Sequence, residues 1–218
     1  MCGYIQRTAK IPKLERILQG WGIAEPLPFG RFWPGTPISG VIIGSDAGVR
    51  AVEAMWWFLL EEKGGALKPN RQITCFNARN LDGRLWRTPF KTSRCVIPAT
   101  AIVETKANQS YLMEATEGLL LGGLYRTWAD GDHLAYSCSV ITCEPHPRFS
   151  QYHDKSIPLL LPPDPALLET WLDPGFSDVG FFGGLIDQVR IPTDFEVTPV
   201  KNSQTLAPQG PTERLEKD

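Results

Sequence analysis

The fold class follows from a central stretch of short apolar runs: RCVIPATAIVE (residues 94–104), SYLMEA (110–115), LLLGGLYRTW (119–128) and HLAYSCSVITC (133–143). The upstream runs ISGVIIG (38–44), VRAVEAMWWFLL (49–60) and RQITCFNA (71–78) have the same character. All are rich in β-branched or aromatic residues and are punctuated at short intervals by Gly, Asn, Asp or Pro, which is typical of antiparallel strands. Few helical segments separate them, so we expect no crossover connections and no parallel sheet.

Two segments outside these runs predict helices. Residues 11–19 carry four apolar side chains at helical spacing. Residues 165–172 follow Asp164, a good residue for capping a helix start. The intervening residues 25–40 are rich in Pro and Gly and predict an irregular loop. We therefore expect one α+β domain over residues 1–218, with a mainly antiparallel, barrel-like β core flanked by a few helices.

Composition and length fit a globular protein in water. The 218 residues are 42% apolar and 21% charged, which is ordinary for such proteins. No run approaches the ~18 consecutive apolar residues that a membrane-spanning helix needs. The opening residues, MCGYIQRTAKIPK, lack the apolar core of a secretory signal, so we expect a cytoplasmic protein. We expect the last ~10 residues to form a flexible tail.

The cysteines favour neither disulfides nor a metal. Their number is odd and their spacing scattered, at Cys2, Cys75, Cys95, Cys138 and Cys143. There is no Cys-x-x-Cys pair, and Cys138, Cys143 and His146 form only a loose cluster. We expect Cys75, Cys95 and Cys138 to be core residues, and we expect no metal and no cofactor.

Positive charge is concentrated in one segment, although the formal net charge is −2. From Lys63 to Arg94 there are eight basic residues, and Asp82 is the one acid, a local excess of seven. A basic segment in a mildly acidic protein suits a confined phosphate-binding groove. A solvated basic surface explains the same charges equally well, so both interpretations stay open.

The second residue carries the most distinctive chemistry. Initiator methionine is normally removed before a small residue, which would leave Cys2 with an α-amine and a thiol on adjacent carbons. Such an aminothiol condenses with an aldehyde through its amine and then closes a five-membered thiazolidine ring through its sulfur. The α-amine has a pKa near ~8, so a useful fraction is nucleophilic at neutral pH. Gly3 allows close approach of the backbone to a ligand.

Four short motifs follow one another along nearly the whole chain. Met1-Cys2-Gly3 opens it, Asn77-Ala78-Arg79 ends an apolar run, and Glu104 closes the run that begins at Arg94. His153-Asp154-Lys155 then leads into the apolar run 157–161. In this order they resemble the SOS response-associated peptidase family, whose SRAP domains begin Met-Cys-Gly and crosslink to abasic sites in DNA.

The resemblance implies a catalytic group made of Cys2, Asn77, Glu104 and His153. Abasic sugar is mainly a closed hemiacetal, so its capture needs a proton donor and a proton shuttle. The resemblance assigns these tasks to His153 and Glu104, and both residue types can be tuned toward neutral pH. Asn77 suits holding the amine or a sugar hydroxyl, because it both donates and accepts hydrogen bonds.

The resemblance also implies residues that bind single-stranded DNA. Arg79 and Lys155 are expected to bind phosphates, Arg31 is a further candidate, and Trp57 is expected to stack on a base. Lys155 stands where the family has Arg, and Thr105 where it has Trp after the catalytic Glu. The sequence thus predicts covalent capture of abasic sites in single-stranded DNA by a nucleoid-associated monomer, with no membrane partner.

Two other functions stay open. Glutamine amidohydrolases with an N-terminal nucleophile also begin Met-Cys-Gly, and in them the thiol attacks an amide carbonyl. Those enzymes carry an Asn-Gly motif, which this sequence lacks. A binding module without catalysis is the third class, favoured by the changes around Asn77 and Lys155.

Overall fold

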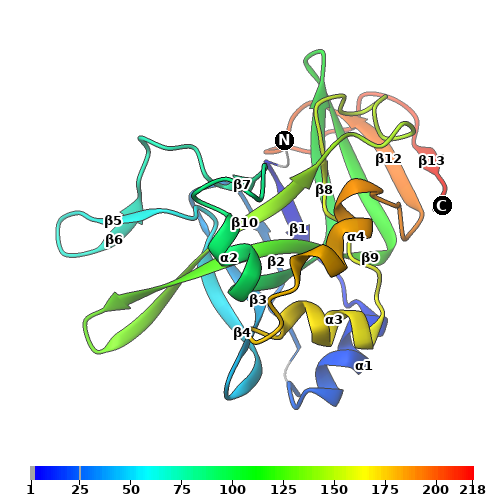
Figure 1. Ribbon diagram of the computed structural model, residues 1–218. Helices are drawn as coiled ribbons and strands as arrows, with labels where there is room; N and C mark the ends of the chain where they lie inside the picture. The colour runs from blue at the N-terminus through cyan, green and yellow to red at the C-terminus, as the bar shows by residue number, and fades with distance from the viewer. Residues whose placement is uncertain (1–2, 25) are drawn as a thin grey trace.

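The core is a ring of strands, as the computed structural model of residues 3–24 and 26–218 shows (Figure 1). Its members are β3 (Pro37–Ser45), β4 (Gly48–Met55), β8 (Arg94–Lys106), β9 (Gln109–Asp130) and β10 (His133–Cys143). Each pairs with the next around the ring, and β8 pairs with both β3 and β9. All these ladders are antiparallel except β4–β10, which rests on one parallel bridge between Met55 and Ser137. The prediction of a mainly antiparallel, barrel-like core is confirmed.

Shorter strands extend the ring at its edges. They are β1 (Ile5–Arg7), β2 (Gly30–Phe32), β7 (Asn77–Ala78), β11 (Ile157–Pro158), β12 (Phe195–Val200) and β13 (Glu213–Leu215). β1 joins β8 to β2, β12 joins β9 to β13, and both β7 and β11 pair with β10. A separate hairpin consists of β5 (Leu60–Glu62) and β6 (Leu67–Pro69).

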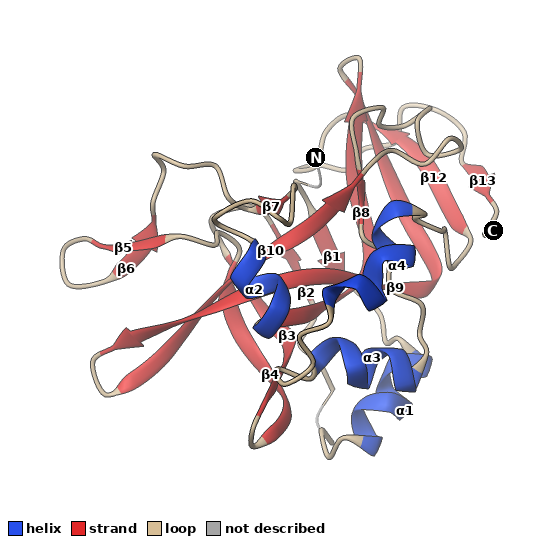
Figure 2. Cartoon of the chain, viewed as in Figure 1, coloured by secondary structure: helices blue, strands red, loops and turns tan. Residues whose placement is uncertain are grey.

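The helices lie around the strands rather than between them (Figure 2). They are α1 (Pro12–Gly20), α2 (Arg87–Thr92), α3 (Pro165–Leu172), the 3-10 helix η1 (Val179–Phe182) and α4 (Gly183–Asp187). The two predicted helices are confirmed as α1 and α3, and the Asp164 side chain caps α3 by accepting from the Leu167 amide at 2.9 Å. The others span six residues or fewer, too short for a helical period to emerge from sequence. Within the described residues no helix is long and apolar enough to cross a membrane.

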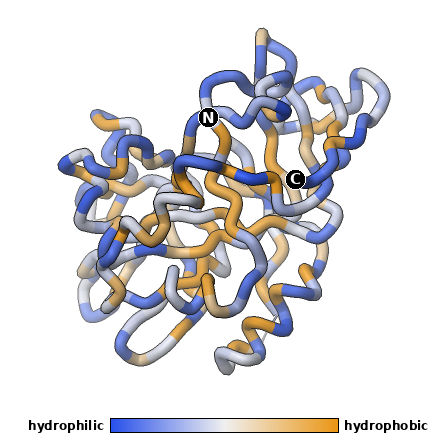
Figure 3. Tube along the Cα trace, turned by 45° about the vertical axis from the view of Figure 1, so that its right-hand side comes forward, coloured by the Kyte–Doolittle hydropathy of each residue, from blue (hydrophilic) through white to orange (hydrophobic). Residues whose placement is uncertain are grey.

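The apolar stretches run through the interior of the ring (Figure 3). Cys75, Cys95 and Cys138 are fully buried, as expected. Charged side chains are buried as well, among them Arg94, the first residue of β8, which is 2% exposed. Its guanidinium donates to five main-chain oxygens, those of Phe90, Lys91, Trp171, Asp173 and Phe176. It thereby ties α2, α3 and the loop after α3 to the ring.

Three strand predictions were wrong in part. Pairing of run 49–60 stops at Met55 and resumes only at Leu60 in β5; between them the chain bends, and Trp56 and Trp57 are both buried. Of run 71–78, only Asn77 and Ala78 join the sheet. Runs 110–115 and 119–128 form one strand, β9, whose register against β8 shifts between Ala99 and Ala101.

Two segments are more ordered than the sequence indicates. The predicted loop 25–40 contains β2 and the start of β3. The expected C-terminal tail is instead held against the sheet, because β13 pairs with β12. The Asp218 side chain also accepts from the Ile191 amide at 2.7 Å and forms an ion pair with Arg148.

Candidate active site

Glu104 is buried near the end of β8, where the N-terminal strand joins the ring. Glu104 is 1% exposed. The neighbouring Val103 amide donates to the Tyr4 carbonyl at 3.3 Å, one residue before β1 begins. The described chain therefore starts beside Glu104. Cys2 itself lies outside the described residues, and Gly3 is the nearest described residue to it.

Tyr4 anchors this start of the chain in a small second core. Tyr4 is fully buried with Ala101, Val103, Leu112 and Val200. Its ring meets Trp33 edge to face at 5.4 Å, and its hydroxyl donates to the Gln6 side chain at 2.8 Å. No motif singled out this role of Tyr4, although an aromatic ring directly after Met-Cys-Gly is a signal for it.

His153 lies beside Glu104, on a turn that precedes β11. Its Nδ1 is 2.8 Å from the Thr105 carbonyl oxygen and 3.6 Å from Glu104 Oε2. Because a carbonyl oxygen only accepts, Nδ1 carries the hydrogen, and Nε2 is the nitrogen that gains or loses a proton. The structure thus brings together two of the residues that the motifs singled out.

Burial shifts the pKa of both groups so that their uncharged forms are favoured. It raises the pKa of Glu104 to about 7, because a charged carboxylate is poorly solvated there. It lowers the pKa of His153 from its ordinary value for the same reason. At neutral pH the carboxyl group therefore exists in both forms, as a general acid or base requires.

Asn77 stands on a different element. β7 lies parallel to β10, and Asn77 is in register with Val140. Its side chain is half-buried.

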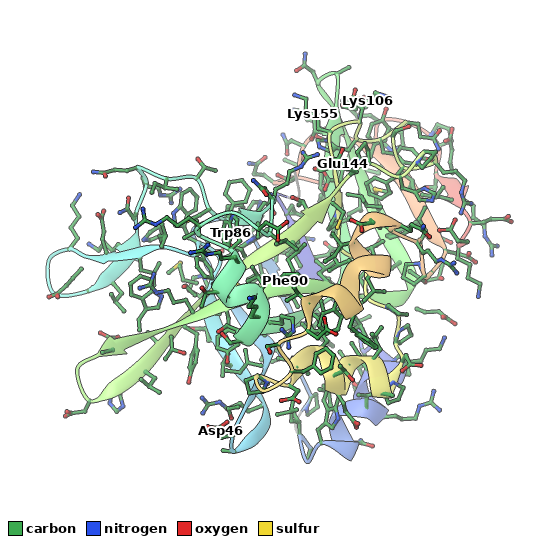
Figure 4. The ribbon with its side chains drawn as sticks, viewed as in Figure 1. Asp46, Trp86, Phe90, Lys106, Glu144 and Lys155 are labelled. Atoms are coloured by element: carbon green, nitrogen blue, oxygen red, sulfur yellow. The ribbon has the colours of Figure 1, made fainter. Side chains whose placement is uncertain are left out.

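Arg79, just after β7, reaches across to the turn that holds His153. Its Nη1 donates to the Lys155 carbonyl at 2.9 Å, and its Nη2 forms an ion pair with Glu144 Oε1 at 2.7 Å. Glu144, Lys155 and Lys106 lie at the same end of the molecule (Figure 4). Lys106 Nζ donates to the Ser150 carbonyl at 2.6 Å, so β8 also holds this turn. Neither Glu144 nor Lys106 was a candidate from sequence.

The other predicted DNA contacts divide into exposed and buried residues. Lys155 and Arg31 are exposed. The prediction that Trp57 stacks on a base is wrong. Trp57 is 5% exposed, its Nε1 donates to the Asn70 carbonyl, and the Arg71 guanidinium lies 4.6 Å from the centre of its ring. A ring covered in this way offers no face to a base.

The basic segment 63–94 loses one member, since Arg94 is buried, and its other seven basic residues are exposed. Within the described part of the chain, no three His, Cys, Asp or Glu side chains gather as metal ligands.

The protein is a mainly antiparallel ring of strands in which the first strand joins the ring beside a buried Glu–His pair. Residues 1–203 match the family described as SOS response associated peptidase (SRAP), and the chain belongs to this family.

Curated relatives include three abasic site processing proteins of Bacillus subtilis. YoaM is 29% identical over 203 residues, covering 85% of each chain. YoqW is 24% identical over 200 residues, covering 85% of this chain and 86% of its own. YobE is 23% identical over 225 residues, covering 94% and 98%.

Solved structures share the fold. A phage-related protein of Bordetella bronchiseptica is 20% identical with a TM-score of 0.64, covering 95% of this chain and 100% of its own. A protein of Bacteroides thetaiotaomicron is 18% identical with a TM-score of 0.64, covering 92% and 93%.

Proposed function

We propose that this protein processes abasic sites in single-stranded DNA by capturing the sugar covalently through Cys2. One observation carries the proposal. A buried carboxyl with a pKa of about 7 and a histidine 3.6 Å away lie where the N-terminal strand meets β8. Cys2 precedes Tyr4, which makes the contact with β8, by two residues in the sequence. Relatives over most of the chain are named abasic site processing proteins, which supports the same substrate.

The reaction begins with opening of the sugar ring. Protonated Glu104 donates to the ring oxygen, and the C1′ hydroxyl loses its proton to His153 Nε2 as the carbon–oxygen bond of the ring breaks. The aldehyde that results is the electrophile for the α-amine. The carboxylate and imidazolium that result attract each other strongly, because little solvent screens the two charges.

The amine then adds to the aldehyde carbon, and loss of one water leaves an imine. The Cys2 sulfur adds to the imine carbon, its proton passes to the nitrogen, and a thiazolidine ring closes. A proton donor is needed for the departing hydroxide and an acceptor for the thiol proton, and Glu104 with His153 supplies both. Asn77 holds the amine or a sugar hydroxyl by hydrogen bonding.

Exposed cations bring the strand to this site. Lys155 and Arg31 attract phosphates, together with the exposed basic residues of segment 63–94. The terminal nitrogens of Arg79 each carry a second N–H beyond the bond to protein, so its guanidinium serves both the turn and a phosphate.

Intact mass spectrometry tests the proposal. The wild-type protein, mixed with a single-stranded oligonucleotide bearing one abasic site, should begin at Cys2 and gain the mass of the oligonucleotide less one water. Cys2→Ala should form no adduct that survives denaturation. Cys2→Ser keeps the amine and should give only an adduct that borohydride must trap. A stable adduct of undiminished yield with Cys2→Ala would refute the mechanism.

A further inference from the structure

We propose that Glu144, acting through Arg79, is a positioning residue that holds the turn of His153 in place. The inference rests on the proposed function, and it concerns a residue that no motif singled out. Glu144 directly follows β10, and Arg79 directly follows β7. Their side chains meet at 2.7 Å between Nη2 and Oε1.

The strand pairing explains why this contact reaches His153. β7 and β11 both pair with the end of β10, through residues 140–141 and 142–143 respectively. The guanidinium of Arg79 leaves β7, bonds Glu144 beyond β10, and bonds the Lys155 carbonyl two residues before β11. One side chain therefore links the ends of three strands, and its last contact is two residues from His153.

The turn is fixed on its other side by β8. The Thr105 carbonyl is 2.8 Å from His153 Nδ1, and Lys106 bonds the Ser150 carbonyl. Contacts from β8 fix the ring nitrogen and the start of the turn, and Lys106 Nζ also lies 4.0 Å from the Asp154 side chain. Arg79 supplies the contact at the end of the turn, so the main chain on both sides of His153 is held.

The exposure of the Glu144–Arg79 ion pair indicates that Glu144 orients Arg79 rather than stabilising the fold. The Glu144 side chain is 83% exposed and that of Arg79 is 46% exposed. Ion pairs at such exposure contribute little to the free energy of unfolding. A carboxylate nevertheless aligns a guanidinium strongly in direction, because its oxygen accepts along a fixed N–H. Without it, Arg79 samples other rotamers and its bond to Lys155 is made less often.

The charge of Glu144 suggests a competing role, namely repelling DNA phosphates from Arg79. The two roles separate by substitution. Glu144→Gln removes the charge and keeps an oxygen that accepts from Arg79, whereas Glu144→Ala removes both. Glu117→Ala is the matched control, because Glu117 also forms an exposed ion pair, with Lys13, at another part of the surface.

The experiment measures three quantities on the full chain: the rate of adduct formation at saturating abasic oligonucleotide, the affinity for the undamaged oligonucleotide, and the pKa of the His153 imidazole by NMR. The His153 signal is assigned with His153→Ala. Small misplacements of reacting groups cost up to ~10²-fold in rate, so Glu144→Ala should lose about tenfold. Glu144→Gln should stay within about twofold of the wild type, and Glu117→Ala should match it.

The NMR titration does not depend on DNA chemistry. Burial lowers the pKa of His153, so a loosened turn in Glu144→Ala should move that pKa up toward its ordinary value. Glu144→Gln should leave it in place. If the wild type forms no adduct, the proposed function fails, and the titration alone still decides the positioning role.

Two results would overturn the inference. One is a wild-type rate and an unshifted His153 titration in Glu144→Ala. The other is tighter DNA binding at an unchanged rate in both Glu144 variants, which would make the residue a screen for phosphate only.

Discussion

The two ends of β8 each bury an ionisable side chain, and they treat it in opposite ways. At the first residue, Arg94 is 2% exposed and gives its hydrogens to five main-chain oxygens. Burial lowers its pKa only to about 10, so it stays charged at neutral pH. Near the other end, Glu104 is 1% exposed and its pKa rises to about 7.

The difference lies in what surrounds each group. Fixed carbonyl dipoles solvate the Arg94 cation almost as water would, so its charge is structural and does not change. The raised pKa of Glu104 shows that its surroundings compensate the carboxylate less completely, and a proton therefore binds near neutral pH. Burial alone therefore does not show whether an ionisable group has a structural or a chemical role. The hydrogen-bond donors and acceptors around the group determine which role it can have.

Glu104→Gln tests this contrast with the largest expected effect. If Glu104 works by proton transfer, the rate of adduct formation at saturating DNA should fall by roughly 10²–10⁴-fold. The amide has nearly the same shape and carries no charge, so the melting temperature at neutral pH should not fall. Single-turnover kinetics and thermal unfolding measure the two. A lower melting temperature with an unchanged rate would place Glu104 with Arg94 as a structural residue.

Arg94→Met should show the reverse pattern. Methionine fills similar volume but removes five hydrogen bonds, each with a net contribution of roughly 0.5–1 kcal/mol. We expect the free energy of unfolding to fall by roughly 3–5 kcal/mol, measured by urea titration. The fraction that stays folded should form adducts at the wild-type rate. A slow reaction in fully folded Arg94→Met would break the comparison.

The pH dependence of stability gives the smallest effect. Folded Glu104 keeps its proton up to about pH 7, whereas the ordinary value for the unfolded chain is 4.5. The stabilisation is therefore complete below pH 4.5 and is lost as pH rises through about 7. Between about pH 5 and pH 8, the stability of Glu104→Gln relative to wild type should rise by about 2–3 kcal/mol.

Urea titrations at several pH values measure this difference. His153 contributes with the opposite sign, because its lowered pKa gives stability that is lost as pH falls. To the extent that both proteins keep the same His153 pKa, its contribution cancels in the difference. Parallel stability curves for the two proteins would show that Glu104 titrates in its ordinary range.

Much of the fold could be predicted from sequence, because long apolar runs with turn residues between them leave a clear pattern. The prediction was wrong where an apolar run is buried without being paired as a strand. Trp56 and Trp57 continue an apolar run, yet the chain bends inward there, and nothing in the composition separates an inward bend from a strand. Short helices such as α2 fail for lack of length.

Only the part of the candidate site that depends on the type of side chain could be predicted from the sequence. Cys2, Glu104 and His153 stand out by type and motif, and two of them do meet within 3.6 Å. The contacts of Arg79 and Lys106 with Lys155 and Ser150 could not be predicted, since their acceptors are main-chain carbonyls. Every residue has such a carbonyl, so the partner leaves no mark in the sequence.

The order in which the chain is made gives the position of β1 a further consequence. Ile5 pairs with Ile102, and Tyr4 accepts from Val103, so β1 and its other partner, β2, do not pair with the ring until β8 exists. His153 comes later still. A ribosome adds roughly 5–20 residues each second, so β1 waits several seconds at least for β8. Although β1 precedes the other strands of the ring in the sequence, it thus joins the ring late, and the site is assembled only after His153 has been made.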